Sequence, residues 1–549
     1  MRFDSGRKFS ASECPLALIL LRLHMREKGL VLGAYGDCGE SSLKLSITGQ
    51  KFDNIVGGRI SQILKMAGLK PGTAKTLTNL GNDYYAVAVA HAGAEAAAYN
   101  ENECLEECKE NVRVAAGAGA RALQEQGINQ IFIEGFTNPE PAAEGATLAV
   151  WRYQELKDRA DRYPDVKLEL FENDDIDGWN RGKVKAENQN LARKIEETPA
   201  NLMTPYIFGQ MAVDSLCSCG IIVDVRDKDW IESMRMSAYL QVARGSCEPP
   251  IFVEISYCGL GGQNPVVLTG KGITFDSGGL CLKDCRGMSE YRGDLAGAAV
   301  IVGVMKTIAM MALPIDVIGL IPLAESMIGG MAAHPGDIVR ARNGKTIMIE
   351  DTDNEGRVIL ADTLSYAQTY HPCLVIDVAT LTPGIRKALG TSASGTWTNS
   401  NVVWRELERA GSETGDRLWR MPLWKYYKAR ITGKAVTFDS GGVNLKDCPM
   451  SEHRGDIAGA AVMIGVMNAI CRMRLPLNVV AVLPVIENMP SGMAVKPGDV
   501  VMAKNGKTIR IEDTDNEGRV ILADVMSYME KHNPCLILNA ATSNRMFVP

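Results

Sequence analysis

The sequence has few histidines and no cysteine pattern typical of a zinc site. Six histidines occur among 549 residues, and none belongs to an HExxH motif, which excludes a thermolysin-type centre. The 14 cysteines are scattered, without a CxxC pair or zinc-finger spacing. We therefore interpret them as free thiols in a reducing compartment.

Strong positive charge and long apolar runs are also lacking. The formal net charge is −6, which disfavours nucleic acid and anionic membrane surfaces as partners. We expect no membrane span, because the early apolar run at 16–22 is far shorter than the roughly 20 residues that a spanning helix needs. Basic residues precede this run, as in a targeting leader, whereas Asp4 and Glu13 argue against a mitochondrial one. The compartment stays open between cytosol and mitochondrion.

The length predicts two to four domains, and the patterns predict α/β architecture. Residues 111–136 show a helical pattern, a glycine turn and a buried strand. Beyond about 245, continuous apolar runs predict buried strands, and 293–311 predicts a helix that opens with small residues. The charged segment 156–190 has the polarity of a region that joins domains. A helix within 191–208 is expected to stop at Pro199.

One part of the sequence occurs twice. "GKGITFDSGGLCLKD" at 270–284 returns as "GKAVTFDSGGVNLKD" at 433–447, and "IEDTDNEGRVILAD" is identical at 349–362 and 511–524. Two copies at so long a period do not make a solenoid. We interpret the repeat as a duplicated piece of one domain, produced by joining two related tandem sequences.

The segment "DTDNEGR" at 351–357 has three interpretations. It could be a polar turn. It could be a calcium loop, but "RNGKTIMIE" before it predicts a hairpin and not the entering helix of an EF-hand. A separate motif, "NGKT" at 343–346, resembles the end of a phosphate-binding loop. That assignment is disfavoured, because Val339 stands where such a loop requires a glycine.

The third interpretation is a metal-dependent hydrolytic site. Lys271, Asp276 and Lys283 lie in a glycine-rich stretch after a buried strand. The carboxylates of Asp276, Asp294, Asp353 and Glu355 are expected to converge from strand ends. Such a cluster would repel itself unless cations neutralised it, and two divalent ions roughly 3.5–4 Å apart would do so. Oxygen-rich ligation suits manganese, magnesium or zinc.

With these motifs, and with "TPANLMTP" and "GDRLWRMPLW", the chain resembles the leucine (cytosol) aminopeptidase family over most of 29–427 and again over 433–542. The resemblance implies an N-terminal α/β domain, a linking helix and a catalytic α/β domain on a mixed sheet. It also implies a homohexamer that removes N-terminal residues, often leucine, from peptides.

The resemblance implies a role for each motif residue. Lys283 would polarise the scissile carbonyl, and Arg357 would hold a bicarbonate that takes the proton of a water bridging two metal ions. Lys271 would bind metal as a neutral amine with a depressed pKa. The full set of implied metal ligands is Lys271, Asp276, Asp294, Asp353 and Glu355. The second copy carries the matching residues Lys434, Asp439, Asp456, Asp515 and Glu517, with Lys446 and Arg519.

Some positions depart from the family pattern. Asp351 and Asn354 replace asparagine and alanine, and Pro383 replaces a glycine beside the substrate. The family's C-terminal tail is expected to be missing from both copies. The predicted domains are an N-terminal domain (29–190), a linking helix (191–210), a catalytic domain (211–427) and a partial second copy (428–549). The alternative to an enzyme is an inactive assembly protein with this fold.

Overall fold

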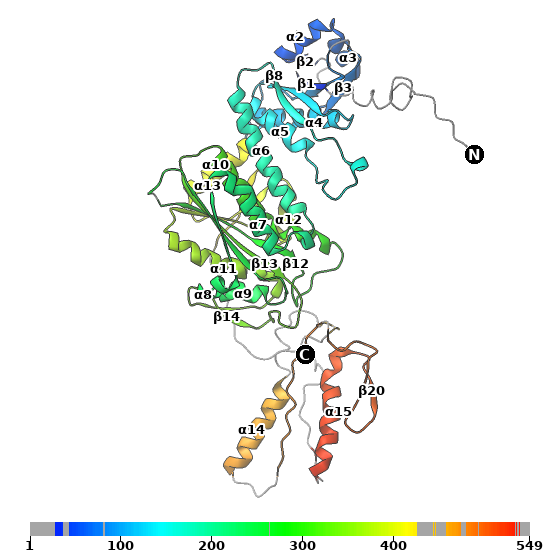
Figure 1. Cartoon of the computed structure of the whole chain (residues 1–549), viewed down its shortest axis with the longest axis vertical. Helices are drawn as coiled ribbons and strands as arrows, with labels where there is room; N and C mark the ends of the chain where they lie inside the picture. The colour runs from blue at the N-terminus through cyan, green and yellow to red at the C-terminus, as the bar shows by residue number, and fades with distance from the viewer. Residues whose placement is uncertain are drawn as a thin grey trace, which may run out of the picture. The chain divides into compact units, whose positions relative to one another are not determined.

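The computed structural model describes residues 28–36, 43–80, 83–262, 264–424, 443, 445, 457–473, 479–491, 493–532, 534 and 537. The chain divides into two compact units. Unit 1 comprises Met1–Lys194 and Thr382–Leu423, and unit 2 comprises Ile195–Leu381 and Trp424–Pro549. Each unit contains a mixed sheet with helices (Figure 1), which confirms the predicted fold class.

The sheet of unit 1 has the strand order β3-β4-β1-β7-β8, with β2 paired to β1. Four of its strands are parallel, and β2 and β3 run antiparallel to their neighbours. The strands are β1 (Lys28–Tyr35), β2 (Lys44–Leu45), β3 (Ala74–Thr78), β4 (Ala86–His91), β7 (Gln130–Glu134) and β8 (Lys167–Phe171), with a separate ribbon of β5 (Tyr99–Asn100) and β6 (Leu105–Glu106).

Helices cover both faces of this sheet. Leu30 and Leu32 of β1 belong to one core with helix residues such as Phe52 and Ile60, whereas Val31 belongs to the core on the opposite face. Alternate strand residues point to opposite faces, so burial on both sides explains the continuous apolar runs. The helices are α2 (Ile47–Ile55), α3 (Arg59–Ala67), α4 (Glu107–Gln124), α5 (Pro139–Val150), α6 (Ile176–Glu197), α12 (Gly384–Leu389) and α13 (Asn401–Thr414).

Residues 382–423 contact the first part of the chain within unit 1. Lys109 on α4 pairs with Glu413 on α13 at 2.9 Å, and a short parallel ribbon joins β17 (Ser394–Thr396) to β18 (Leu418–Arg420). The charged segment 156–190 is not a simple linker, because it contains β8 and the first part of α6. The predicted domain limits stay predictions.

Unit 2 contains a sheet in the order β16-β11-β13-β10-β9, with β12 paired to β13. Parallel pairing joins β11 to β13 and β16, and antiparallel pairing joins β10 to β9 and β13. The strands are β9 (Ile222–Arg226), β10 (Ile251–Cys258), β11 (Val266–Gly270), β12 (Gly272–Asp276), β13 (Asp316–Ser326) and β16 (Leu374–Val378), with a hairpin of β14 (Ile338–Arg340) and β15 (Thr346–Met348). They confirm the strands expected after residue 245.

The helices of unit 2 begin after the predicted interruption at Pro199. The helix α7 (Pro205–Leu216) starts at Pro205, and the Thr204 hydroxyl accepts a hydrogen bond from the amide of Ile207. The other helices of the first copy are α8 (Lys228–Ser233), α9 (Ser237–Ala243), α10 (Ala296–Met310) and α11 (Glu355–Ala367), and the 3₁₀ turns that carry predicted site residues are η4 (Met288–Leu295) and η5 (Thr352–Asn354).

The sequence predicted no apolar segment long enough to cross a membrane, and this prediction needs a correction. The turn η4 continues into α10, and the joined segment Met288–Met310 is long and apolar enough, by length and composition, to cross a membrane. Half of that window is buried inside the protein. We therefore interpret α10 as a core helix packed against the sheet.

The second copy repeats several elements of the first. They are α14 (Ala458–Met473), β19 (Val500–Met502), β20 (Thr508–Arg510), η9 (Thr514–Asn516) and α15 (Glu517–Met529). Their apolar side chains are less covered. Val302 and Leu323 are fully buried in the first copy, whereas Ile464 and Val485, at the matching positions, are 59% and 66% exposed.

Candidate functional site

The turn after β12 carries two of the predicted site residues. Asp276 ends the strand, and its Oδ1 accepts a hydrogen bond from the amide of Gly278 at 2.8 Å. Gly278 has a φ of +85°, a left-handed conformation that glycine adopts at little cost. The chain then folds back, with the amide of Lys283 donating to the Ser277 carbonyl at 2.9 Å. This geometry places Lys283 beside Asp276.

The segment 351–357 enters the site from a hairpin. Gly344 has a φ of +82° between β14 and β15, which confirms the Asn-Gly hairpin turn. An EF-hand requires an entering helix here, so the calcium-loop interpretation fails. Asp351 then caps the next turn, because its Oδ1 accepts a hydrogen bond from the Asp353 amide at 3.0 Å. Helix α11 begins directly afterwards, at Glu355.

Thr352 ties this segment to the turn after β12. Its hydroxyl donates to the Gly278 carbonyl at 2.6 Å and accepts from the Cys281 amide at 2.8 Å. Thr352 is itself buried. The two motifs are therefore held together by the Thr352 hydroxyl, which bonds to main-chain groups of the turn, and not by their charged side chains alone.

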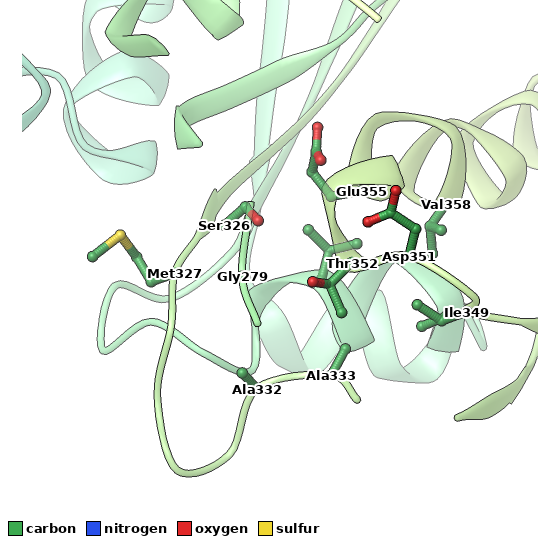
Figure 2. Close-up of a pocket in the computed structure, with 11 residues that line it drawn as sticks. Gly279, Ser326, Met327, Ala332, Ala333, Ile349, Asp351, Thr352, Glu355 and Val358 are labelled. Carbon is green, nitrogen blue, oxygen red and sulfur yellow. The ribbon is translucent and has the colours of Figure 1, made fainter. Parts of the chain in front are cut away.

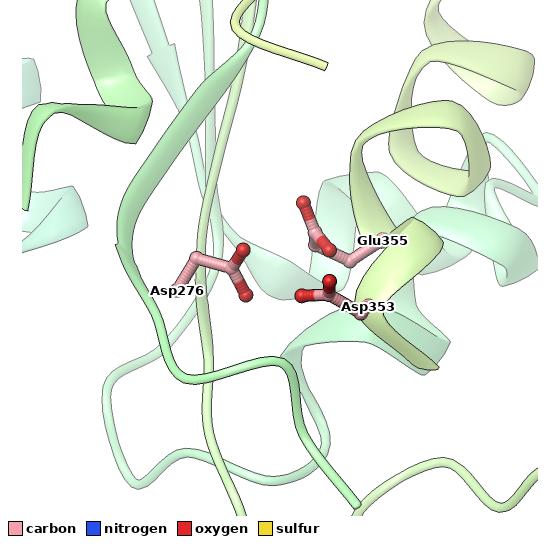
Figure 3. Close-up of side chains that lie close together, drawn as sticks. All are labelled: Asp276, Asp353 and Glu355. Atoms are coloured by element: carbon pink, nitrogen blue, oxygen red, sulfur yellow. The ribbon is translucent and has the colours of Figure 1, made fainter. Parts of the chain in front are cut away.

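Three carboxylates meet where these segments join. Ligand oxygens of Asp276, Asp353 and Glu355 all lie within 4.8 Å of one another, and the side chains point toward one another in Figure 3. The sequence predicted that all these carboxylates converge from strand ends. Only Asp276 does so, because Asp353 lies in the turn η5 and Glu355 begins helix α11. Burial, together with the charges of Asp276 and Asp294, raises the pKa of Glu355 to about 7 against the opposing charge of Lys271.

Lys271 connects Asp294 to this group. Its Nζ is 2.9 Å from Glu355 Oε1, donates to the Thr380 carbonyl at 2.8 Å and also pairs with Asp294. Asp294 Oδ1 accepts a hydrogen bond from the Thr380 hydroxyl at 2.6 Å, and burial raises the pKa of Asp294 to about 6. Asp294 thus reaches the cluster through Lys271.

The protein groups do not depress the pKa of Lys271. Burial lowers this pKa, but the charges of Asp294 and Glu355 outweigh burial, so the net pKa lies above the ordinary value. Lys271 is 1% exposed and bridges the carboxylates as an ammonium. The predicted neutral amine therefore requires a further positive charge in the site.

Lys283 lies on the other side of the cluster. Its Nζ is 2.8 Å from Asp276 Oδ2 and also pairs with Asp353. The same ammonium lies 4.3 Å from the centroid of the Tyr291 ring. Sequence reasoning missed Tyr291, because no sequence motif marks its contact with Lys283.

Arg357 does not join this network. It is exposed on α11, and its Nη1 donates to Asn354 Oδ1 within the same segment. Asn354 is one of the residues that depart from the family pattern, so this bond belongs to a feature of this chain. The structure brings together the other six predicted residues.

The donor set fits divalent cations. Glu355 Oε2 is buried and has no hydrogen-bond partner, and a buried carboxylate oxygen is costly to leave unpaired. Carboxylate oxygens without histidine suit hard or borderline divalent ions. Such an ion could use the unpaired oxygen and offset the repulsion among the three carboxylates.

A small cavity lies behind the cluster. Its volume is about 20 Å³, enough for about one water and too small for a leucine side chain. In Figure 2, the carboxyl group of Glu355 points away from the loop that carries Met327 and Ala332, and Thr352 lies between Glu355 and Ala333. The cavity lining is Val242, Gly279, Ser326, Met327, Ala332, Ala333, Ile349, Asp351, Thr352, Glu355 and Val358.

Part of this geometry recurs in the second copy. Asp513 Oδ1 accepts from the Asp515 amide at 3.0 Å, as Asp351 does for Asp353. Asp515, Glu517 and Arg519 lie among the described residues, whereas Lys434, Asp439, Lys446 and Asp456 lie outside them. The matching Asp524 and Asp362 differ, because Asp362 is fully buried and Asp524 is exposed.

These observations define a class of protein: a catalytic-type α/β unit with a buried lysine–carboxylate site suited to divalent cations, attached to a separate α/β unit. The chain belongs to the cytosol aminopeptidase family. The family's catalytic domain matches residues 190–432 and again 428–548, and its N-terminal domain matches 31–160. The double match agrees with the predicted duplication.

Named relatives agree with this family. Cytosol aminopeptidase of Bos taurus is 43% identical over 411 residues, which cover 74% of this chain and 79% of that protein. The protein of the same name from Homo sapiens is 42% identical over the same shares. Among solved structures, the bottromycin maturation enzyme BotP is 27% identical with a TM-score of 0.62, covering 79% of this chain and 88% of that one. Family and relatives support an aminopeptidase, an enzyme of the metal-dependent type.

Proposed function

We propose that the chain is a two-cation aminopeptidase that removes N-terminal residues, leucine among them, from peptides. The observation that carries this proposal is the meeting of Asp276, Asp353 and Glu355 within 4.8 Å, with one Glu355 oxygen buried and unpaired. Lys271 and Lys283 pair with these carboxylates as positively charged partners. Neither lysine packs an apolar core, which favours a chemical role for both.

The proposed cation ligands are Lys271, Asp276, Asp294, Asp353 and Glu355. When bound, two divalent cations supply an activated water at neutral pH and a clamp for the substrate. Manganese, zinc and magnesium all suit oxygen donors, and one solved relative, BotP, is described in complex with Mn. Lys271 must lose its proton to act as a ligand, because an ammonium has no lone pair to donate.

Lys283 has the role of an electrostatic catalyst in this proposal. Its ammonium stands beside Asp276 and Asp353, where it can donate to the scissile carbonyl oxygen as negative charge develops there. Arg357 is proposed to hold a bicarbonate that accepts the proton of the attacking water. One guanidinium nitrogen, Nη1, is bonded to Asn354, so the other N–H donors of Arg357 would bind this anion.

Assembly and location are proposed from the family. We propose a homohexamer acting on peptides in the cytosol, in keeping with relatives named cytosol aminopeptidase; a mitochondrial location is the alternative. The proposed domain limits are those predicted above. We propose no partner among nucleic acids or membranes, because the net charge is −6.

One observation favours the rival function of an inactive assembly protein. In the described sheet of unit 2, β16 pairs with β11 and forms an edge, and such edges are sites of association between chains. Hydrolysis of a leucyl anilide by protein loaded with Mn²⁺ or Zn²⁺ separates the two functions. Turnover that is lost in Lys283→Ala supports the enzyme. Folded, soluble protein that binds no cation and shows no turnover would leave the assembly protein.

A further inference from the structure

The aromatic ring of Tyr291 forms part of the environment of Lys283. Tyr291 belongs to the 3₁₀ turn η4, and the Lys283 ammonium lies 4.3 Å from the centroid of its ring. A 3₁₀ helix has three residues per turn, so residues three apart share one side. The turn that directs Asp294 toward Lys271 therefore also presents Tyr291 to Lys283.

The other partners of Lys283 are the carboxylates of Asp276 and Asp353. The proposed function assigns both carboxylates to cations. Lys283 would then lose its two anionic partners and gain two positive neighbours. A lysine has four rotatable side-chain bonds and a strongly hydrated head, so repulsion alone would turn it toward solvent.

The Tyr291 ring can hold the ammonium under these conditions. An aromatic face attracts a cation through its quadrupole without competing for a metal ion, and the attraction grows as the pair is shielded from water. The Lys283 side chain is only 11% exposed, so the pair is well shielded. No proton transfer by the tyrosine hydroxyl is needed for this role.

We propose that Tyr291 is a positioning residue that keeps the Lys283 ammonium over the site when Asp276 and Asp353 bind cations. The inference rests on the proposed function and deepens it. Tyr291 acts through Lys283 and is not itself a catalytic residue. The second copy has His453 at the matching position, so the two copies differ at this residue.

The test compares Tyr291→Phe with Tyr291→Leu in the full chain loaded with Zn²⁺. Phenylalanine keeps the ring and removes the hydroxyl, whereas leucine removes the ring. With a leucyl anilide as substrate, we expect Tyr291→Phe to stay within about twofold of the unmodified chain, and Tyr291→Leu to lower kcat about tenfold with KM little changed. Bound zinc per chain should be equal in all three proteins.

A double-mutant cycle identifies the route of the effect. In a Lys283→Ala background, Tyr291→Leu should cause no further loss, because its partner is already absent. An equal loss in both backgrounds would overturn the proposal. A loss in Tyr291→Phe as large as in Tyr291→Leu would assign the effect to the hydroxyl, and a pure rise in KM would make Tyr291 a wall of the substrate pocket; either would overturn it as well.

A second readout does not depend on turnover. The rate at which acetic anhydride acetylates Lys283 in the zinc-loaded chain can be followed by peptide mass spectrometry. We expect this rate to be at least about fivefold higher in Tyr291→Leu than in Tyr291→Phe or the unmodified chain, because the released side chain reaches solvent, where its deprotonated amine attacks the anhydride and acetate leaves. Equal rates would overturn the positioning role. If the unmodified chain binds zinc but never turns over, the proposed function fails while this comparison still decides the placement of Lys283.

Discussion

Lys271 Nζ lies 2.9 Å from Glu355 Oε1, and the next residue, Gly356, lets helix α11 approach this ion pair. A Cβ at Gly356 would come within 2.7 Å of Lys271 Cε. Lys271 cannot easily move away, because it is buried and bonded to Thr380 and Asp294 as well. The glycine of the repeated motif is therefore a steric requirement of the buried lysine.

Gly356→Ala should weaken cation binding at least about tenfold, since the new methyl group pushes Lys271 off its partners. Gly518→Ala is the matched control, because a Cβ at Gly518 meets nothing within 4 Å. Isothermal titration with Mn²⁺ measures both variants. Equal affinities for the two variants would show that α11 does not need this close approach.

Cation affinity should depend on pH, because the proposed ligands Glu355, Asp294 and Lys271 bind protons. Burial raises the pKa of Glu355 to about 7 and that of Asp294 to about 6, and Lys271 carries a proton because its pKa is also raised. Protons therefore compete with cations at low pH and leave when cations bind. We expect Mn²⁺ affinity to rise at least about tenfold from pH 6 to pH 8. Titrations in buffers of different ionisation enthalpy count the released protons; an affinity independent of pH would refute this linkage.

Asp362 and Asp524 offer a stability test of the two copies. Asp362 is fully buried and accepts hydrogen bonds from the amides of Ala238, Tyr239 and Arg342 at 2.7–3.0 Å. Asp362→Ala would leave these donors unpaired and should cost about 2–4 kcal/mol. Asp524→Ala should cost less than about 0.5 kcal/mol, since Asp524 is exposed. Urea unfolding compares the variants, and similar losses would mean that the second copy is covered like the first.

Glu134 in unit 1 should make stability fall as pH rises. Burial raises its pKa to about 7 from 4.5, against the opposing hydrogen bond from Ser46. The folded state therefore holds a proton that the unfolded state has released, and stability falls between about pH 4.5 and pH 7. The loss is about 2–3 kcal/mol and should be absent in Glu134→Gln. Unfolding of both proteins at pH 5 and pH 8 tests this, and parallel pH profiles would contradict it.

Local patterns in the sequence predicted much of the fold. The continuous runs at 251–258 and 316–326 became central strands because helices bury them on both faces, and the Asn-Gly at 343–344 became a hairpin turn. The polarity of the segment 156–190 predicted a region that joins domains, but it did not show that the segment contains the strand β8 and the first part of α6.

The sequence predicted which residues form the site better than it predicted how they are arranged. Motif matches named Asp276, Asp353 and Glu355, but spacing could not show that two of them enter from a helix start. The raised pKa of Lys271 depends on Asp294 and Glu355 lying beside it, which only the folded chain reveals. Tyr291 was missed because an aromatic contact to Lys283 leaves no local pattern.

The most direct test of one working site in the first copy is the number of cations per chain. Purified protein loaded with Mn²⁺ or Zn²⁺ is assayed for bound metal and, on the same sample, for leucyl anilide hydrolysis, beside Asp276→Asn and its second-copy counterpart Asp439→Asn. We predict about two ions per chain with hydrolysis, both lost in Asp276→Asn and both kept in Asp439→Asn. About four ions per chain, or metal and hydrolysis that survive Asp276→Asn, would contradict the account.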